Sequence, residues 1–359
     1  MEGRPKNAGR RTFLGKLAVV GAAGAAGTVV PVGALMPLAA GAAETQRLTV
    51  VSYGGDYQAS QNKAYFVPFG KLNPNLTITQ DSPESDAKLK AMVTAGHVTW
   101  DVAIVADNFG LDADSQWLEP IDYSIIDKNS FLPGYAGKYR VGADVEATVL
   151  AYRKDRFKGA APSKLADFFD LKAFPGKRCA WKYAPSGIFE AALIADGVPA
   201  DKLYPLDIPR AFKKLSTIKE QLVWWDTGAQ SEQLLTSGEV DLGLVWSGRA
   251  LHGAETAPIA LTWNQWLTLS AYWVVPKGTK NKQLAMQAIK SFTSPQAQSE
   301  LTKYLPYGPT NKNAVNTVDP KYKGNLPTDH FDNRIVINFE WWNENLKAVD
   351  PQFQQWLLS

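Results

Sequence analysis

The stretch from Gln230 to Ala250, QSEQLLTSGEVDLGLVWSGRA, constrains the fold more than any other part of this sequence. Leu234 and Leu235 form the apolar stripe of a short helix, and Gly238 stands where a helix-ending residue with positive φ is favoured. Residues 240–246 then place apolar side chains on both faces of a strand, which is typical of a central strand in a parallel sheet. A second helix starts directly after this strand, and ligands of open α/β sheets bind at such strand ends.

The first 42 residues have the layout of an export signal. Five of the 38 basic and one of the 35 acidic residues lie there, and residues 17–42 are uncharged and rich in Ala and Gly. The GRRTFL segment at 9–14 resembles a twin-arginine (Tat) signal, and Ala40-Gly41-Ala42 is a small-residue cleavage pattern. We therefore expect a periplasmic protein that is cleaved near Ala42 and begins near Ala43. An uncleaved membrane tether is the alternative.

Composition excludes several classes of function. The remainder of the chain carries about one net negative charge, so nothing in it indicates nucleic acid or an anionic membrane as a partner. The single cysteine, Cys179, excludes an intramolecular disulfide and is interpreted as a buried small residue. The three histidines lack metal-ligand spacing with one another or with Cys179. We expect no cofactor, no metal and no enzymatic reaction.

Two successive α/β units are predicted after the signal. In the first, strands near 48–51, 76–80 and 100–105 alternate with helices near 57–71 and 84–95. In the second, strands near 178–182, 222–225 and 240–246 alternate with helices. Two short extended runs are predicted between 139 and 152, and another at 271–276. We expect the chain to cross between two lobes near 143–150 and 268–276, with a third crossing near 312–320.

Aromatic and polar side chains near the predicted strand ends are candidate ligand-binding residues. Aromatic rings stack on organic ligands, and carboxylates pair with ammonium groups. For each candidate the alternative is a structural role as a helix cap, a turn residue or a core aromatic residue, with the helix cap favoured for Ser186. The candidates are Tyr53, Asp56, Asp107, Ser186, Asp226, Trp246, Arg249 and Tyr272.

Six segments in order resemble the polyamine-binding branch of bacterial periplasmic solute-binding proteins: LTVVSYGGDYQ, AMVTAGHVTWDVAIV, FPGKR, LLTSGEVDLGLVWSGRA, WVVPKGTKN and YLPYGPTNKNA. The resemblance covers essentially the whole mature chain. It implies an α/β, two-lobed type II periplasmic-binding fold with a ligand cleft between the lobes, and an inner-membrane ABC transporter permease as partner. We expect lobe 1 to be 43–145 plus 273–312, and lobe 2 to be 146–272 plus 313–359. The ligand positions that it implies are Tyr53, Asp56 or Tyr57, residues 106–108 with Asp107 and Asn108, and Trp246.

The sequence departs from the polyamine pattern where an amine would bind. One carboxylate of that pattern falls on Ala271, two others fall near Ala184 and Gly187, and Arg249 replaces a small residue. A polycation needs carboxylates to replace its lost water. We therefore expect a ligand that carries a carboxylate or phosphonate, as in an amino-acid derivative, with Arg249 holding it through two parallel hydrogen bonds. An Arg249 that faces solvent or pairs with Glu255 is the alternative.

The predicted function is a monomeric solute-binding component of an ABC transporter. It captures a small polar organic solute, an amino-acid derivative or a polyamine-like compound, by hinge closure. Trp246, Tyr53 and Tyr272 would stack on the ligand, and Asp56, Asp107 or Asp226 would pair with an ammonium group. A Tat-exported enzyme and a receptor that presents its ligand to a sensor protein remain alternatives. A cofactor motif would favour the enzyme, and the sequence shows none.

Overall fold

A computed structural model describes residues 46–359, so the predicted export signal and its cleavage site lie outside the described residues. The described chain is built on one nine-stranded sheet with the order β2-β1-β3-β8-β4-β7-β5-β6, and β9 pairs with β8. The strands are β1 (Gln46–Val51), β2 (Leu76–Asp81), β3 (Val102–Ala106), β4 (Val141–Arg153), β5 (Arg178–Trp181), β6 (Leu222–Trp225), β7 (Leu242–Trp246), β8 (Ile259–Val274) and β9 (Arg334–Ile335).

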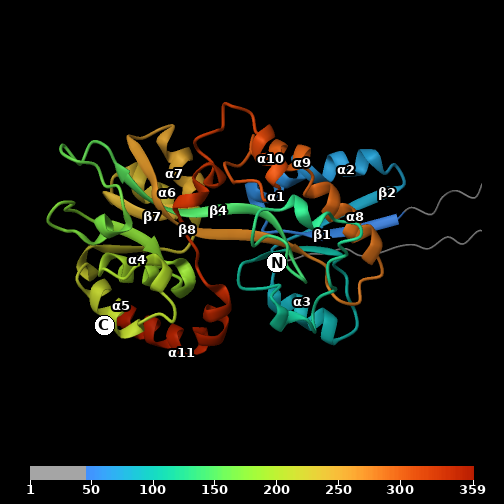
Figure 1. The fold of residues 1–359 in the computed structure, drawn as a ribbon, viewed down its shortest axis with the longest axis horizontal. Helices are drawn as coiled ribbons and strands as arrows, with labels where there is room; N and C mark the ends of the chain where they lie inside the picture. Colours follow the sequence, from blue (N-terminus) through green and yellow to red (C-terminus); the bar gives the residue numbers. More distant parts are fainter. Residues whose placement is uncertain (1–45) are drawn as a thin grey trace, which may run out of the picture. The chain divides into compact units, whose positions relative to one another are not determined.

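The sheet consists of two parallel groups joined by two long antiparallel strands. β1, β2 and β3 are parallel to one another, and so are β5, β6 and β7, which confirms the two predicted α/β units. β4 and β8 pair with each other along nearly their whole length, and β3 and β7 flank this pair on its two sides. In Figure 1 the pair runs side by side across the middle of the described chain. Strand β7 is central as predicted, but its partner β4 is antiparallel.

The prediction of two short extended runs between 139 and 152 is wrong, because β4 is a single strand of 13 residues. Nearly all of its residues are buried, since it lies between β7 and β8, and so it lacks the simple alternation of a half-exposed strand. A shift in its register between Gly142 and Asp144 accommodates the polar stretch that looked like a break. β8 is likewise longer than predicted, with 16 residues.

Helices cover both groups of strands (Figure 1). Their ends follow local sequence signals: Ser85 accepts a hydrogen bond from the Lys88 N–H at the start of α3, and Gly238, with a φ of 77°, ends α6 as predicted. The helices are α1 (Gly55–Gln61), α2 (Val67–Leu72), α3 (Asp86–Thr94), α4 (Ile188–Ala195), α5 (Ile208–Ser216), α6 (Gly228–Ser237), α7 (Ser247–Ala254), α8 (Lys282–Phe292), α9 (Pro295–Leu301), α10 (Lys312–Thr317) and α11 (Phe339–Leu358).

The last helix, α11, was not predicted from the sequence. It has 20 residues and buries Phe339, Trp342, Val349 and Phe353 on one side, against the apolar cluster that also contains α4 and α5. Pro351 and the dense aromatic residues hide this helical spacing in the sequence. The helix begins where the Asn338 side chain accepts a hydrogen bond from a backbone N–H of its first turn.

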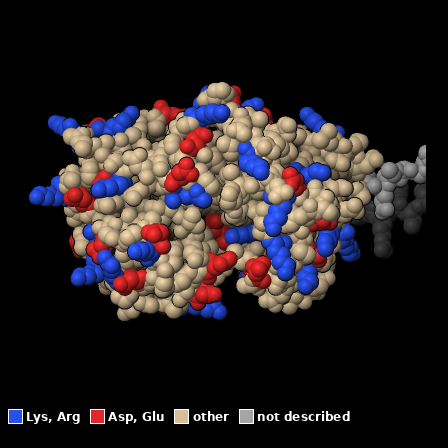
Figure 2. Space-filling model, in the orientation of Figure 1, with Lys and Arg blue, Asp and Glu red and all other residues tan. Residues whose placement is uncertain are grey.

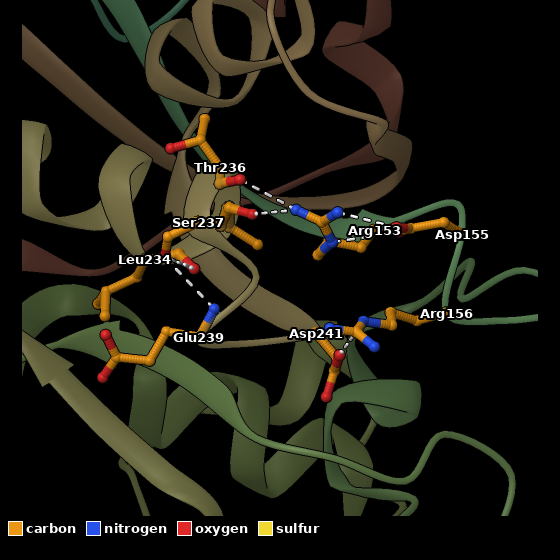
Figure 3. A network of polar contacts seen from close by, with 9 residues as sticks. Arg153, Asp155, Arg156, Leu234, Thr236, Ser237, Glu239 and Asp241 are labelled. Atoms are coloured by element: carbon orange, nitrogen blue, oxygen red, sulfur yellow. Dashed lines mark hydrogen bonds and ion pairs between the residues drawn. The ribbon is translucent and has the colours of Figure 1, made fainter.

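A polar network ties the end of β4 to α6 and β7 (Figure 3). The Arg153 guanidinium donates to the carbonyl oxygens of Leu235 and Thr236, at 3.0 and 3.1 Å, and pairs with Asp155. A cation at this end of a helix is favoured by the helix dipole. Arg156 pairs with Asp241 just before β7, at 3.0 Å. These contacts fix the far end of β4, so that its middle section is presented between the two groups of strands.

Most of the large aromatic residues belong to the core. Trp100, Trp225, Trp266, Trp273 and Trp342 are all fully buried. Cys179 is also buried, as predicted. The aromatic content therefore serves the core first, and only a few rings remain for a ligand site.

Candidate ligand-binding site

Two carboxylates lie in the middle of β4, where it passes between the two groups of strands. Asp144 stands directly across from Ala271 of β8, and Glu146 stands across from Leu269. Residues two apart on a strand, and residues paired across two strands, share one face of the sheet. Both carboxylates therefore project from the same face. The sequence analysis missed them because it divided this strand into two runs.

Three tyrosines surround these carboxylates. The Tyr57 hydroxyl donates to Oδ2 of Asp144 at 2.5 Å. The Tyr57 ring lies with its centroid 5.3 Å from that of Tyr53 and 6.0 Å from that of Tyr307. We call this group, Tyr53, Tyr57, Asp144, Glu146 and Tyr307, the Asp144 cluster. It combines residues from α1, the segment before it, β4 and the segment after α9.

The cluster is electrostatically incomplete. Burial raises the pKa of Asp144 and of Glu146, and the charge of Asp144 raises the pKa of Glu146 further. Burial also raises the pKa of Tyr53, even though its side chain is 37% exposed, and the nearby carboxylates add to this effect. Among residues 46–359, Oδ1 of Asp144 has no hydrogen-bond partner. Buried carboxylates need a cation or donors to replace their lost water, so a cationic group fits this place.

The first turn of α7 packs against the other side of the cluster. A Cβ atom on Gly248 would lie only 3.2 Å from a ring carbon of Tyr307. Burial, followed by the charges of Glu146 and Asp144, raises the pKa of Tyr307, and the charge of Arg249 opposes this rise. Tyr307 thus stands between the acidic residues of β4 and the cation of α7. The site is negative at one end and positive at the other.

Arg249 is half-exposed and faces the first turns of α6. Its Nη1 lies 3.5 Å from Glu232, so the pair with Glu255 that was the alternative is replaced by one with Glu232. His252 makes a second, shorter contact with the same carboxylate. A half-exposed ion pair at this distance contributes little to stability. Arg249 can therefore exchange Glu232 for a ligand carboxylate at low cost.

Trp246 is the centre of an aromatic group next to α7. Its ring meets Trp181 and Trp225 edge-on, each with centroids 5.2 Å apart. Within the described part of the chain, the indole N–H of Trp246 and the buried hydroxyl of Ser247 have no hydrogen-bond partner. A Cβ atom on Gly228 would lie 2.8 Å from both the Trp246 ring and Nε of Arg249, so these two side chains lie close together, with two polar groups nearby that a ligand could satisfy.

Four other predicted site residues lie outside the Asp144 cluster and the aromatic group of Trp246. Asp56 is exposed in the first turn of α1, and Asp226 is exposed just after β6. Ser186 is buried, and its predicted alternative role as a helix cap is wrong, because Gly187 is the N-cap of α4 and no side chain caps that helix. The carbonyl oxygen of Asn108 accepts a hydrogen bond from Asn343 of α11.

Asp107 and Tyr272 lie together, beside Arg140. Tyr272 alternates with Ala271 along β8, so its side chain leaves the opposite face of the strand from the Asp144 cluster. It stacks on Tyr135, and the Arg140 guanidinium lies 3.9 Å from its ring centroid. Oδ2 of Asp107 accepts the backbone N–H of Ser270 at 2.6 Å. The charge of Asp107 raises the pKa of both Asp144 and Glu146, so Asp107 lies near the Asp144 cluster, whereas the Tyr272 side chain leaves the other face of β8.

Comparisons with known proteins agree with this architecture. Residues 64–328 match the family model of bacterial extracellular solute-binding proteins. The chain is 34% identical over 328 residues to the gamma-aminobutyric acid-binding protein of Pseudomonas aeruginosa, covering 89% of this chain and 93% of that protein. A solved structure of the Atu4243–GABA receptor has 38% identity and a TM-score of 0.82, with 87% and 98% of the two chains covered. The spermidine/putrescine-binding periplasmic protein of Escherichia coli is 24% identical over 163 residues, 44% of this chain and 45% of that protein.

The chain belongs to the bacterial extracellular solute-binding protein family and has the two-lobed type II periplasmic-binding fold, as predicted. It is a small-solute-binding component of the kind that works with ABC transporter permeases. The match to the amino-acid-binding relative is longer and more identical than the match to the polyamine-binding one. Among residues 46–359, no helix is both long and apolar enough to span a membrane, and no group of side chains there has the composition of a metal site.

Proposed function

We propose that this protein binds γ-aminobutyric acid, or another ω-amino acid of similar length, between the Asp144 cluster and the start of α7. The observation that carries the proposal is the separation of charge, with the buried Asp144 and the half-buried Glu146 on β4, and with Arg249 on α7, whose first turn packs against Tyr307. A zwitterion whose ammonium and carboxylate groups lie at opposite ends complements both. The ligand named for the Pseudomonas aeruginosa relative is such a molecule.

The ammonium group would bind at Asp144 and Glu146. Asp144 is the register partner of Ala271, the position where the polyamine pattern carries a carboxylate. This position in the sheet thus has a carboxylate in both cases, but here β4 supplies it instead of β8. The rings of Tyr53 and Tyr57 would add cation–π contacts, which strengthen when the cation is desolvated.

The carboxylate group would bind at the start of α7. The first backbone N–H groups of a helix point toward an anion, and the helix dipole favours negative charge there. Arg249 would turn from Glu232 to form two parallel hydrogen bonds, and the Ser247 hydroxyl would donate a further one. Trp246 would cover the apolar middle of the ligand.

Ligand binding would favour closure of the two lobes, because Tyr53 and Tyr57 follow β1 in one group of strands, whereas Arg249 follows β7 in the other. We place the lobes at 43–145 plus 273–312 and at 146–272 plus 313–359, with β4 and β8 as the crossing strands. The mature monomer would act in the periplasm after Tat export and cleavage near Ala42, and would deliver its ligand to an inner-membrane ABC permease.

Calorimetric titration with γ-aminobutyric acid, butyrate, butylamine and putrescine tests the proposal. We expect γ-aminobutyric acid to bind roughly a hundredfold more tightly than butyrate or butylamine, since butyrate leaves Asp144 without a cation and butylamine makes no hydrogen bonds with Arg249. Putrescine is the second candidate because Asp144 and Glu146 together suit an amine. Tighter binding of putrescine than of γ-aminobutyric acid would reject the zwitterion and restore a polyamine as the ligand.

A further inference from the structure

A second hollow lies on the other face of β8 from the Asp144 cluster. Thr268, Ser270 and Tyr272 alternate with Leu269 and Ala271, so their side chains leave the opposite face of the strand. They line a pocket of about 500 Å³, a volume typical of small-molecule sites. Figure 2 shows the surface hollowed between α11 and the part of the chain that carries α3, with acidic and basic side chains at the edge.

The two walls of this pocket come from parts of the chain that are far apart in the sequence. Asp107, Tyr135 and Arg140 belong to the segments that follow β3. Arg334 and the residues from 336 to 340 belong to β9 and the beginning of α11. A molecule in the pocket would contact both walls at once, together with the crossing strand β8.

Two arginines are held rigidly in these walls. Arg140 donates through Nη1 to the carbonyl oxygens of Asp107 and Phe109, at 2.6 and 2.8 Å, and lies over the Tyr272 ring. Arg334 donates through Nη1 to the Phe331 carbonyl at 2.7 Å and lies over the ring of the same residue. A guanidinium has five N–H donors, so each arginine keeps donors for a ligand. Because protein contacts already fix both side chains, little conformational entropy is lost on binding.

The lining holds two arginines and two carboxylates, Asp107 and Glu340, so its formal charges balance, and an anion is favoured by the remaining guanidinium donors rather than by net charge. The buried carboxylate, Asp107, is occupied by the Ser270 N–H and lies beside Arg140. Glu340 is exposed at the rim, in the first turn of α11. The start of this 20-residue helix adds partial positive charge. Two fixed cations on opposite walls match two carboxylates at the ends of one short molecule.

We propose that this pocket is a second binding site, for a small dicarboxylate held between Arg140 and Arg334. The stacked rings of Tyr135 and Tyr272 form its flat side, and the hydroxyls of Thr268 and Ser270 lie at its floor. The site is separate from the one proposed for the amino-acid ligand, which lies on the other face of β8.

Titration of the protein with succinate and with glutarate, followed by calorimetry and by thermal unfolding, tests this site. We expect one dicarboxylate per chain. Arg334→Gln should weaken binding by about tenfold or more, since it removes a charge-assisted pair of hydrogen bonds. Val336→Glu should also abolish binding. Val336 lines the pocket and is 57% exposed, so the substitution places a negative charge beside the negatively charged dicarboxylate while both arginines are kept. Arg210→Gln is the matched control, because Arg210 is an exposed arginine on α5 that pairs with Asp196. This variant should bind the dicarboxylate as tightly as the wild type does.

Separate sites would be supported if succinate leaves the affinity for γ-aminobutyric acid unchanged. They would also be supported if succinate changes that affinity only up to a limit at high succinate concentration. An affinity for γ-aminobutyric acid that falls in proportion to succinate without limit would overturn the proposal, because it would show one shared site. No binding of either dicarboxylate, or equal binding by Arg334→Gln and the wild type, would overturn it as well. The Arg334 comparison decides the matter even if γ-aminobutyric acid is not the ligand of the first site.

Discussion

Asp107 and Asp144 are buried aspartates on the two sides of strand β8, and their surroundings differ. Burial raises the pKa of each to about 7. Asp107 accepts the Ser270 N–H and lies beside Arg140, and both contacts lower its pKa against the larger effect of burial. Asp144 accepts only the Tyr57 hydroxyl among residues 46–359. The contrast separates a carboxylate that supports the fold from one that is left for a ligand.

Substitution of Asp144 should affect ligand affinity but not stability, whereas substitution of Asp107 should lower stability. Asp144→Asn keeps the acceptor for Tyr57 but removes the charge, so we expect γ-aminobutyric acid to bind roughly a hundredfold less tightly, with the thermal midpoint unchanged or raised. Asp107→Ala leaves the buried Ser270 N–H unpaired and should lower the free energy of unfolding by about 1–3 kcal/mol. Calorimetry and denaturant unfolding measure the two effects. A large loss of stability in Asp144→Asn would contradict the contrast.

Arg249→Gln tests the positive end of the site. We expect binding of γ-aminobutyric acid to weaken by about tenfold to a hundredfold, because a charge-assisted hydrogen-bond pair to the carboxylate is lost. Binding of butylamine, which has no carboxylate, should change little. Equal losses for both ligands would mean that Arg249 acts through the fold of α7 rather than through the carboxylate.

The raised pKa of Asp144 predicts a pH dependence. The ammonium group needs the ionised carboxylate, so affinity should be full above about pH 8 and fall by about tenfold per pH unit below pH 7. The ligand-free protein should lose stability as the pH rises from about 4 to about 7, since the folded state holds this proton in that range and the unfolded chain does not. Calorimetry in buffers of different ionisation enthalpy at pH 6 should detect proton release on binding. An affinity that is constant from pH 6 to pH 8 would exclude a protonated Asp144.

Ala271→Asp should sharpen the distinction from polyamine binding. It places a third carboxylate directly across from Asp144, where the polyamine pattern has one. We expect putrescine to gain about three- to tenfold in affinity, and γ-aminobutyric acid to gain less, because the second amine of putrescine also needs a carboxylate. Ala271→Asn, which has similar volume and no charge, is the control. A gain of the same size with Asn would point to hydrogen bonding rather than charge.

The sequence predicted the two α/β units, the strand-to-helix turn at Trp246 and the family, because these depend on local periodicity, glycine positions and segment order. It did not predict the Asp144 cluster. Asp144 and Glu146 lie in a strand buried on both sides, and their meeting with Tyr57 and Tyr307 depends on contacts between residues far apart in the chain. Tyr272 was misplaced for a related reason, since the face of β8 that each residue occupies depends on register with β3 and β4.

The orientation of the ligand is the central claim, and a thermodynamic cycle tests it most directly. The affinities of the wild type and of Asp144→Asn are measured by calorimetry for γ-aminobutyric acid and for butyrate, which lacks only the ammonium group. We predict that the substitution weakens γ-aminobutyric acid by roughly a hundredfold and butyrate by less than about threefold, a coupling of roughly 2 kcal/mol between Asp144 and the ammonium group. Equal losses for the two ligands would contradict the account, because Asp144 would then not contact the ammonium group.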